Sequence, residues 1–165
     1  MKTVPKKYIL MFALTILYAA TSQAQIAKAE IRATGLTCSM CSNAINKQLK
    51  SLADVENVEI DLNTNTFTVT LKDNNSLKPS VFKENVEKAG FFIGSLILTV
   101  KPEMIKNNDY IIVKGKENSA KELQIQVLDK GYVTDKEFKK LVKFYKNSET
   151  FNNNNEADFH IKILN

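Results

Sequence analysis

Apolar residues between positions 26 and 100 recur with two periods, one typical of strands and the other typical of helices. Alternation with polar residues, as at Val58 and Ile60, predicts half-buried strands at residues 26–33, 58–62, 66–71 and 91–100. Recurrence at three and four residues predicts helices after the cysteines and over residues 76–89, the second ending at Gly90. The first of these helices is expected to bury Ala44, Ile45, Leu49 and Leu52.

The order of these elements is strand, helix, strand, strand, helix, strand. Asn63-Thr64-Asn65 is turn material between two alternating runs, so those two strands are expected to form a hairpin. A chain with this order is predicted to fold as a ferredoxin-like βαββαβ sandwich, with two helices on one face of an antiparallel sheet. We assign residues 25–100 to this domain.

Residues 101–165 are patterned as well, and Lys101-Pro102 marks the predicted boundary because proline cannot continue a central strand. Strands are predicted at 110–113, 123–127 and 159–163, with a turn at 129–131. Thr134 and Glu137 have the spacing of a capping box ahead of a helix. The prediction is therefore a small α+β C-terminal region of unknown role. At this size it would be marginal alone, so it is expected to pack on the first domain.

Residues 1–24 have the three parts of an export signal. Lys2, Lys6 and Lys7 precede an apolar run from Tyr8 to Ala20, and Ser22-Gln23-Ala24 supplies small residues for cleavage. The apolar run is shorter than the ~20 residues of a spanning helix, and no cysteine follows it for lipidation. A mature chain beginning at Gln25, periplasmic or secreted and without stable membrane insertion, is the expectation.

The net charge gives no support for nucleic-acid binding. Loss of the three leader lysines lowers the formal charge from +5 to +2, and the chain has no dense run of lysine or arginine. Nucleic acid is therefore not expected among the partners.

Cys38 and Cys41 are the only cysteines, and they lie where the first strand gives way to the first helix. The positive end of a helix favours thiolates, and thiolates bind soft metal ions. A redox dithiol and an inert pair are the alternatives. Haem attachment would need histidine at position 42, and a closed four-ligand zinc site would need more than His160.

The stretch Gly35-Leu36-Thr37-Cys38-Ser39-Met40-Cys41, together with Glu87-Lys88-Ala89-Gly90-Phe91, resembles the heavy-metal-associated domain family over residues 26–100. The resemblance implies that Cys38 and Cys41 bind the metal. It also implies that Leu36, standing where relatives have methionine, packs under the loop. Thr37 is typical of the copper- and mercury-binding members of the family, so Zn(II) is a less expected ligand than Cu(I) or Hg(II). Phe91 is expected near the metal loop or in the core, and Met40 is not expected to bind metal.

These observations predict an exported protein that binds one soft ion, with Cu(I) first and Hg(II) or Zn(II) as alternatives, and passes it on. No catalytic residue is assigned, and the chain is not expected to be an enzyme. The expected partner is a metal donor or acceptor, such as a metal-exporting ATPase or an efflux component. A periplasmic dithiol–disulfide oxidoreductase and a metal-responsive adaptor acting through residues 101–165 are the alternatives. His160 alternates with apolar neighbours and is expected on the solvent-exposed face of its strand.

Overall fold

The computed structural model describes residues 26–37, 39–106, 109–117, 120–145, 150–151 and 158–164. The predicted signal peptide, its cleavage site and Cys38 lie outside the described residues. Among the helices that are described, none is long and apolar enough to cross a membrane.

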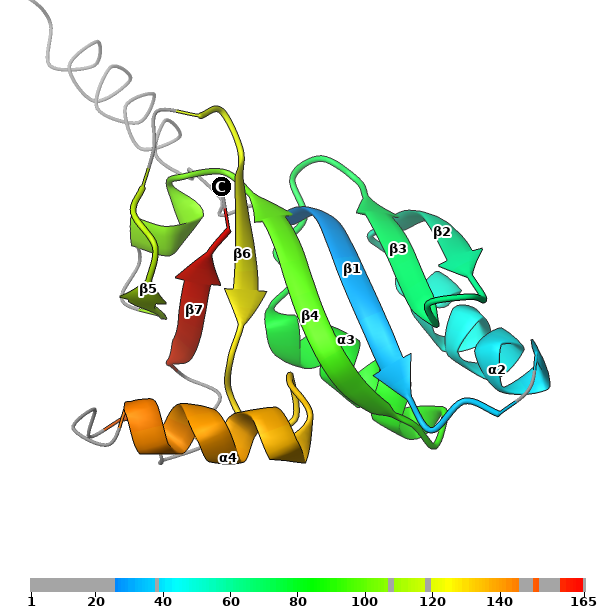
Figure 1. Ribbon diagram of the computed structural model, residues 1–165. Helices are drawn as coiled ribbons and strands as arrows, with labels where there is room; N and C mark the ends of the chain where they lie inside the picture. Colours follow the sequence, from blue (N-terminus) through cyan, green and yellow to red (C-terminus); the bar gives the residue numbers. More distant parts are fainter. Residues whose placement is uncertain are drawn as a thin grey trace, which may run out of the picture.

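The first six elements form the predicted βαββαβ unit. In chain order they are β1 (Ile26–Thr34), α2 (Ser39–Lys50), β2 (Val55–Asp61), β3 (Thr66–Leu71), α3 (Pro79–Lys88) and β4 (Phe92–Val100). The strands lie in the order β2-β3-β1-β4, with every neighbouring pair antiparallel. Helices α2 and α3 lie side by side on one face of this sheet (Figure 1). The ferredoxin-like prediction is confirmed.

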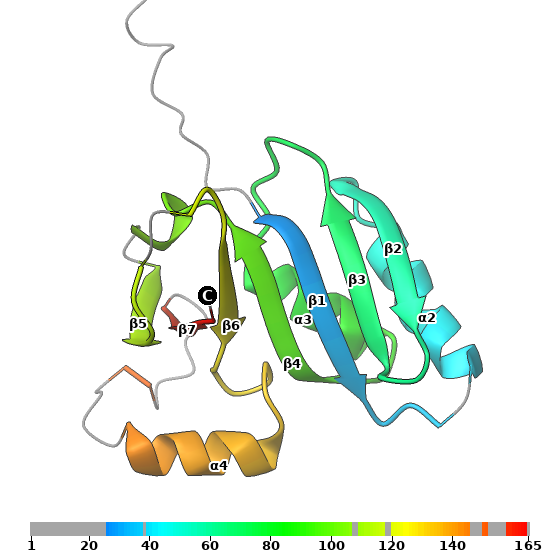
Figure 2. The same cartoon turned by 45° about the horizontal axis from the view of Figure 1, so that its top comes forward.

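The C-terminal region extends this sheet. It contains a short 3-10 helix, η1 (Met104–Lys106), followed by β5 (Tyr110–Lys114), β6 (Leu123–Val127), α4 (Asp135–Phe144) and β7 (Phe159–Ile163). Strand β6 pairs antiparallel with β4, from Leu96 opposite Val127 to Val100 opposite Leu123. The full order is β2-β3-β1-β4-β6-β7-β5, with β5 parallel to β7 at the edge. The described strands form one seven-stranded sheet, and Figures 1 and 2 show the extension beside the βαββαβ unit. The boundary at residue 100 stays a prediction from the sequence.

One hydrophobic core runs beneath both parts of the sheet. The helices contribute Ile45 and Leu49 from α2 and Phe82 and Val86 from α3, all of them buried. The strands contribute side chains from the βαββαβ unit and from the extension, among them Ile31, Val69, Leu98, Ile125, Phe159 and Ile161. Full burial of one such side chain contributes about 1.5–3 kcal/mol. The extension is therefore held by shared core packing as well as by strand pairing.

The buried faces of the two helices differ in detail from the prediction. Ala44 is exposed, whereas Ser42 is 3% exposed and lies on the same face as Ile45 and Leu49. Residues 42, 45 and 49 follow the helical period. Helix α3 begins at Pro79 rather than Ser76, because proline is favoured in the first helical turn and its ring excludes the preceding residue from helical backbone angles.

Helix α4 lies beyond the strand ends and not on the sheet face that α2 and α3 cover (Figures 1 and 2). It lies below the ends of β6 and β7 in Figure 1, and the Thr134 hydroxyl caps it by accepting the Glu137 N–H at 3.3 Å. The predicted cap is thus confirmed. A second hydrophobic cluster forms here from buried Leu128, Val133 and Phe151, against which α4 packs Phe138, Leu141 and Val142.

Tyr110, at the start of β5, should make the free energy of unfolding depend on pH in the alkaline range. Burial, with a smaller contribution from the Asp109 carboxylate, raises the pKa of the Tyr110 phenol above its usual value. The stabilisation from the neutral phenol is fully present below pH ~10, where the unfolded chain begins to ionise, and is lost as the pH rises further. Denaturant unfolding from pH 8 to 11 should show a steeper loss of stability in the wild type than in Tyr110→Phe. Equal slopes would contradict this.

Candidate metal centre

The loop between β1 and α2 has a backbone that only glycine adopts readily. Gly35 ends β1 with φ of +85°, in the left-handed region. Leu36 is half-buried and packs against the core, as predicted, whereas Thr37 is exposed. Three described residues, 35–37, therefore follow the end of β1 on the way to α2, and Leu36 holds this loop by packing against the core.

Cys41 is the third residue of α2 and is half-buried. The first-turn N–H groups of a helix have no intrahelical acceptor, and with the helix dipole they favour a negative charge nearby. The first turn of α2 contains no acidic residue that would oppose a thiolate. Met40 beside it is 79% exposed. The surroundings of Cys41 thus suit a thiolate ligand, and in the sequence Cys38 directly precedes the first residue of α2.

Phe91 lies against the beginning of this loop. Helix α3 ends at Lys88, and Gly90 two residues later has φ of +88° and donates its N–H to the Glu87 carbonyl at 2.8 Å. The chain then turns back, and the Phe91 Cδ1 lies 3.9 Å from the position that a Cβ on Gly35 would occupy. Phe91 also packs against the main core. The two interpretations of Phe91, proximity to the loop and core packing, therefore both hold.

The prediction that His160 is solvent-exposed is wrong. The side chain is 1% exposed, its Nδ1 lies 2.7 Å from the Asp129 Oδ1, and its Nε2 lies 2.9 Å from the Thr150 hydroxyl. The Asp129 Oδ2 also accepts the His160 backbone N–H at 2.7 Å. The Phe151 ring covers the imidazole with centroids 4.9 Å apart. The alternating pattern correctly predicted that His160 points away from the main core. That side of the strand is covered by the second hydrophobic cluster, which includes Phe151, and not by water.

The structure therefore separates the candidate residues into two places. Leu36, Cys41 and Phe91 gather around the loop at the end of β1, whereas His160 lies on β7 in the extension. Within the part of the chain that the structure describes, no three His, Cys, Asp or Glu side chains form a group suited to a metal ion. The loop at the start of α2 is the candidate metal centre.

The βαββαβ order, with Cys38 and Cys41 three residues apart in the sequence near the start of α2, is the arrangement expected for a heavy-metal-associated domain. Comparison with known families agrees, because residues 30–92 match the model of the heavy-metal-associated domain. We therefore identify this part of the chain as a heavy-metal-associated domain. The match ends before η1, β5, β6, α4 and β7.

Similar proteins are named for copper. A copper-transporting ATPase of Saccharomyces cerevisiae is 42% identical over 57 residues, which are 34% of this chain and 6% of the ATPase. The chain thus spans a small fraction of that relative's length. The yeast copper transporter domain CCC2A is 34% identical, with 41% of this chain and 90% of that domain covered at a TM-score of 0.36. The N-terminal domain of a potential copper-translocating P-type ATPase from Bacillus subtilis is 33% identical, with 41% and 82% covered and a TM-score of 0.36.

Proposed function

We propose that this protein binds one Cu(I) ion between the thiolates of Cys38 and Cys41 and transfers it to a partner protein. The observation that carries the proposal is the position of Cys41, half-buried in a first helical turn without acidic residues, directly after the Gly35 loop. The similarity to domains of copper-transporting proteins supports the choice of metal.

The chemistry of a thiolate pair suits both binding and release. Thiolates are soft ligands and prefer Cu(I) over hard ions such as Mg(II). With only two protein ligands the ion keeps open coordination positions, so an incoming thiolate can add before one of the cysteines leaves. The partner is therefore a protein that presents its own thiolates, as a metal donor or acceptor. Hg(II) is the second candidate ion and Zn(II) the third.

An anaerobic titration tests the proposal. Reduced protein should take up one Cu(I) per chain from a chromophoric Cu(I) chelator, with an end point in the absorbance of the chelator complex. The dithiol–disulfide potential of the same sample should be measured in thiol redox buffers. Absence of copper uptake, together with a potential as oxidising as about −120 mV, would overturn the proposal in favour of a dithiol oxidoreductase.

We further propose that the protein works outside the cytoplasm, on the basis of the lysine-rich start, the short apolar run and the Ser-x-Ala site. Expressed with its full N-terminus, the protein should be recovered from the soluble extracytoplasmic fraction with an intact mass beginning at Gln25. An uncleaved chain in the membrane fraction would contradict the assignment.

A further inference from the structure

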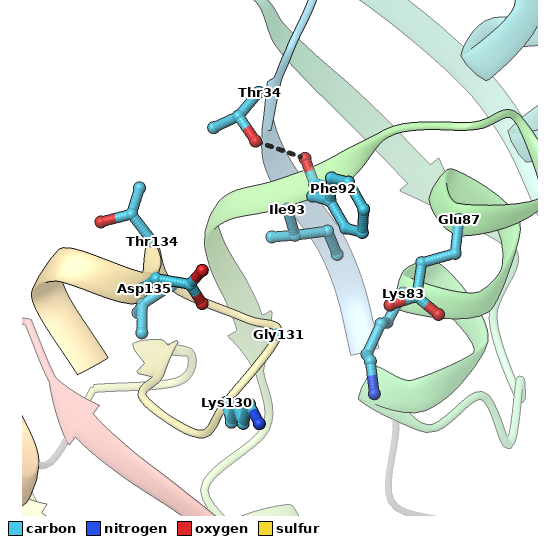
Figure 3. A pocket seen from close by; sticks show the side chains of 10 residues that line it. Thr34, Lys83, Glu87, Phe92, Ile93, Lys130, Gly131, Thr134 and Asp135 are labelled. Carbon is cyan, nitrogen blue, oxygen red and sulfur yellow. Dashed lines mark hydrogen bonds between the residues drawn. The ribbon is translucent and has the colours of Figure 1, made fainter. Parts of the chain in front are cut away.

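A pocket of about 560 Å³ lies where the extension meets the metal-binding domain. One wall comes from α3, a second from the end of β1 and the start of β4, and a third from residues 130–135 between β6 and α4 (Figure 3). The volume is in the range of small-molecule sites. Because one wall belongs to the extension, the βαββαβ unit alone could not form this pocket.

Close packing fixes the wall formed by the extension. Gly131 has φ of +89°, and a Cβ there would lie 2.8 Å from the Cε of Lys83, so the turn rests directly on the Lys83 side chain. The Lys83 ammonium lies 5.6 Å from the centroid of the Tyr132 ring, within cation–π range. An isolated antiparallel bridge joins Val133 to Ser95 of β4. These contacts hold the turn against both α3 and β4.

The pocket is lined by charges of both signs around an apolar floor. Lys83 and Lys130 supply ammonium groups, whereas Glu87 and Asp135 supply carboxylates. Among the described residues, the side chains of Glu87, Lys130 and Asp135 form no ion pair. Figure 3 shows the Glu87 and Asp135 carboxylates on opposite walls, with the ends of the two lysines below them. A ligand that carries both a positive and a negative group would therefore meet an opposite charge for each.

The pocket also adjoins the metal loop. Thr34 lines it and directly precedes Gly35, so the Cα atoms of Thr34 and Thr37, three residue steps apart, lie at most ~11 Å from each other. Phe92, the residue after loop-packing Phe91, lines the pocket too and is 68% exposed. An exposed aromatic ring at a pocket rim offers apolar contact to a bound molecule.

We propose that this pocket binds a zwitterionic short peptide thiol and presents its sulfur to the metal loop. The proposal rests on the proposed copper function for its biological purpose, but not for the binding itself. Lys83 and Lys130 would bind the carboxylate of the peptide, and Glu87 and Asp135 its ammonium group. Each is a charge-assisted contact in a partly enclosed site.

The bound thiol would serve as an exchange ligand for Cu(I). Its sulfur forms a bond to the ion, one cysteine sulfur–copper bond breaks, and the proton of the thiol passes to the released cysteine thiolate. No electron is transferred and the oxidation state of copper is unchanged. The extension thereby couples the heavy-metal-associated domain to a small carrier of soft metal.

Binding is tested first on metal-free protein in which both cysteines are replaced by serine, with S-methyl-L-cysteinylglycine as a probe that cannot bind metal through a thiolate. Saturable NMR shifts are expected at Thr34, Gly131 and Val133. Lys130→Met and Asp135→Asn, both at exposed positions, should each weaken binding about tenfold. Lys136→Met removes an exposed charge outside the pocket and should have no effect. No saturable shift, or equal affinity in all variants, would overturn the proposal.

Exchange is tested next on copper-loaded wild-type protein. L-cysteinylglycine should accelerate Cu(I) release to a chelator, and Lys130→Met should slow this release but not release by 2-mercaptoethanol, which lacks the two charges. Equal slowing with both thiols would refute a role for the pocket in exchange. If the chain failed to bind copper at all, the binding measurement on the serine variant would still decide whether the pocket binds the peptide.

Discussion

Replacing Cys41 with serine is expected to weaken Cu(I) binding by about a thousandfold. Two thiolates on one short segment chelate the ion, so the second sulfur binds at a high effective concentration. A serine hydroxyl is a hard, protonated donor that does not replace a thiolate for a soft ion. Competition titration with a Cu(I) chelator measures the change directly.

Two further variants complete this test. Cys38→Ser should lose affinity to a similar extent, because either substitution leaves a single thiolate. Met40→Leu is the matched control, since Met40 is 79% exposed within the same segment and leucine removes only the thioether. Unchanged affinity in both cysteine variants, or a large loss in Met40→Leu, would place the ion elsewhere.

Asp129→Ala is expected to lower the free energy of unfolding by about 3 kcal/mol. The Asp129 carboxylate accepts two hydrogen bonds from His160, one from the backbone N–H and one from Nδ1, each at 2.7 Å. The substitution leaves both groups buried without this acceptor under Phe151 and α4. Chemical denaturation at neutral pH measures the loss.

The control for this prediction is Asp135→Ala. Asp135 is an exposed acidic residue in the first turn of α4. Its replacement should lower the free energy of unfolding by well under half as much as Asp129→Ala, chiefly because a favourable charge at the positive end of the helix dipole is lost. The double variant Asp129→Ala with His160→Leu should recover part of the loss, because both polar partners are then gone. A loss below 1 kcal/mol in Asp129→Ala would show that the network does not stabilise the extension.

The helices and strands could be predicted because their apolar residues recur at regular intervals along the chain. Strands β3 and β6 alternate buried residues with less buried ones along their whole length, and the cap at Thr134 follows from its spacing to Glu137. An alternating pattern shows which side chains share one face of a sheet, but not whether protein or water covers the other face. His160 alternates with apolar residues as an exposed side chain would, and only the packing of Phe151, itself stacked on Phe138 of α4, against its ring reveals that it is buried.

Contacts between elements that are far apart in the chain could not be predicted from the sequence either. Nothing local to β6 indicates that it pairs with β4, and this pairing makes the extension part of the same sheet. The pocket beside the metal loop draws Lys83 from α3, Phe92 from β4 and Asp135 from α4, which are distant in sequence and unremarkable singly. The candidate metal centre could be proposed from the sequence because Cys38 and Cys41 are only three residues apart in the chain, and it stays a prediction.

X-ray absorption spectroscopy at the copper edge, on the anaerobically loaded full chain, would identify the atoms that bind copper. We expect a first coordination shell of sulfur alone, with about two neighbours per copper ion. His160→Ala should leave the spectrum unchanged, since both imidazole nitrogens lie within hydrogen-bond distance of protein oxygens. A nitrogen neighbour in the wild type that disappears in His160→Ala would refute binding by the two cysteines alone, because it would place the extension in the metal site.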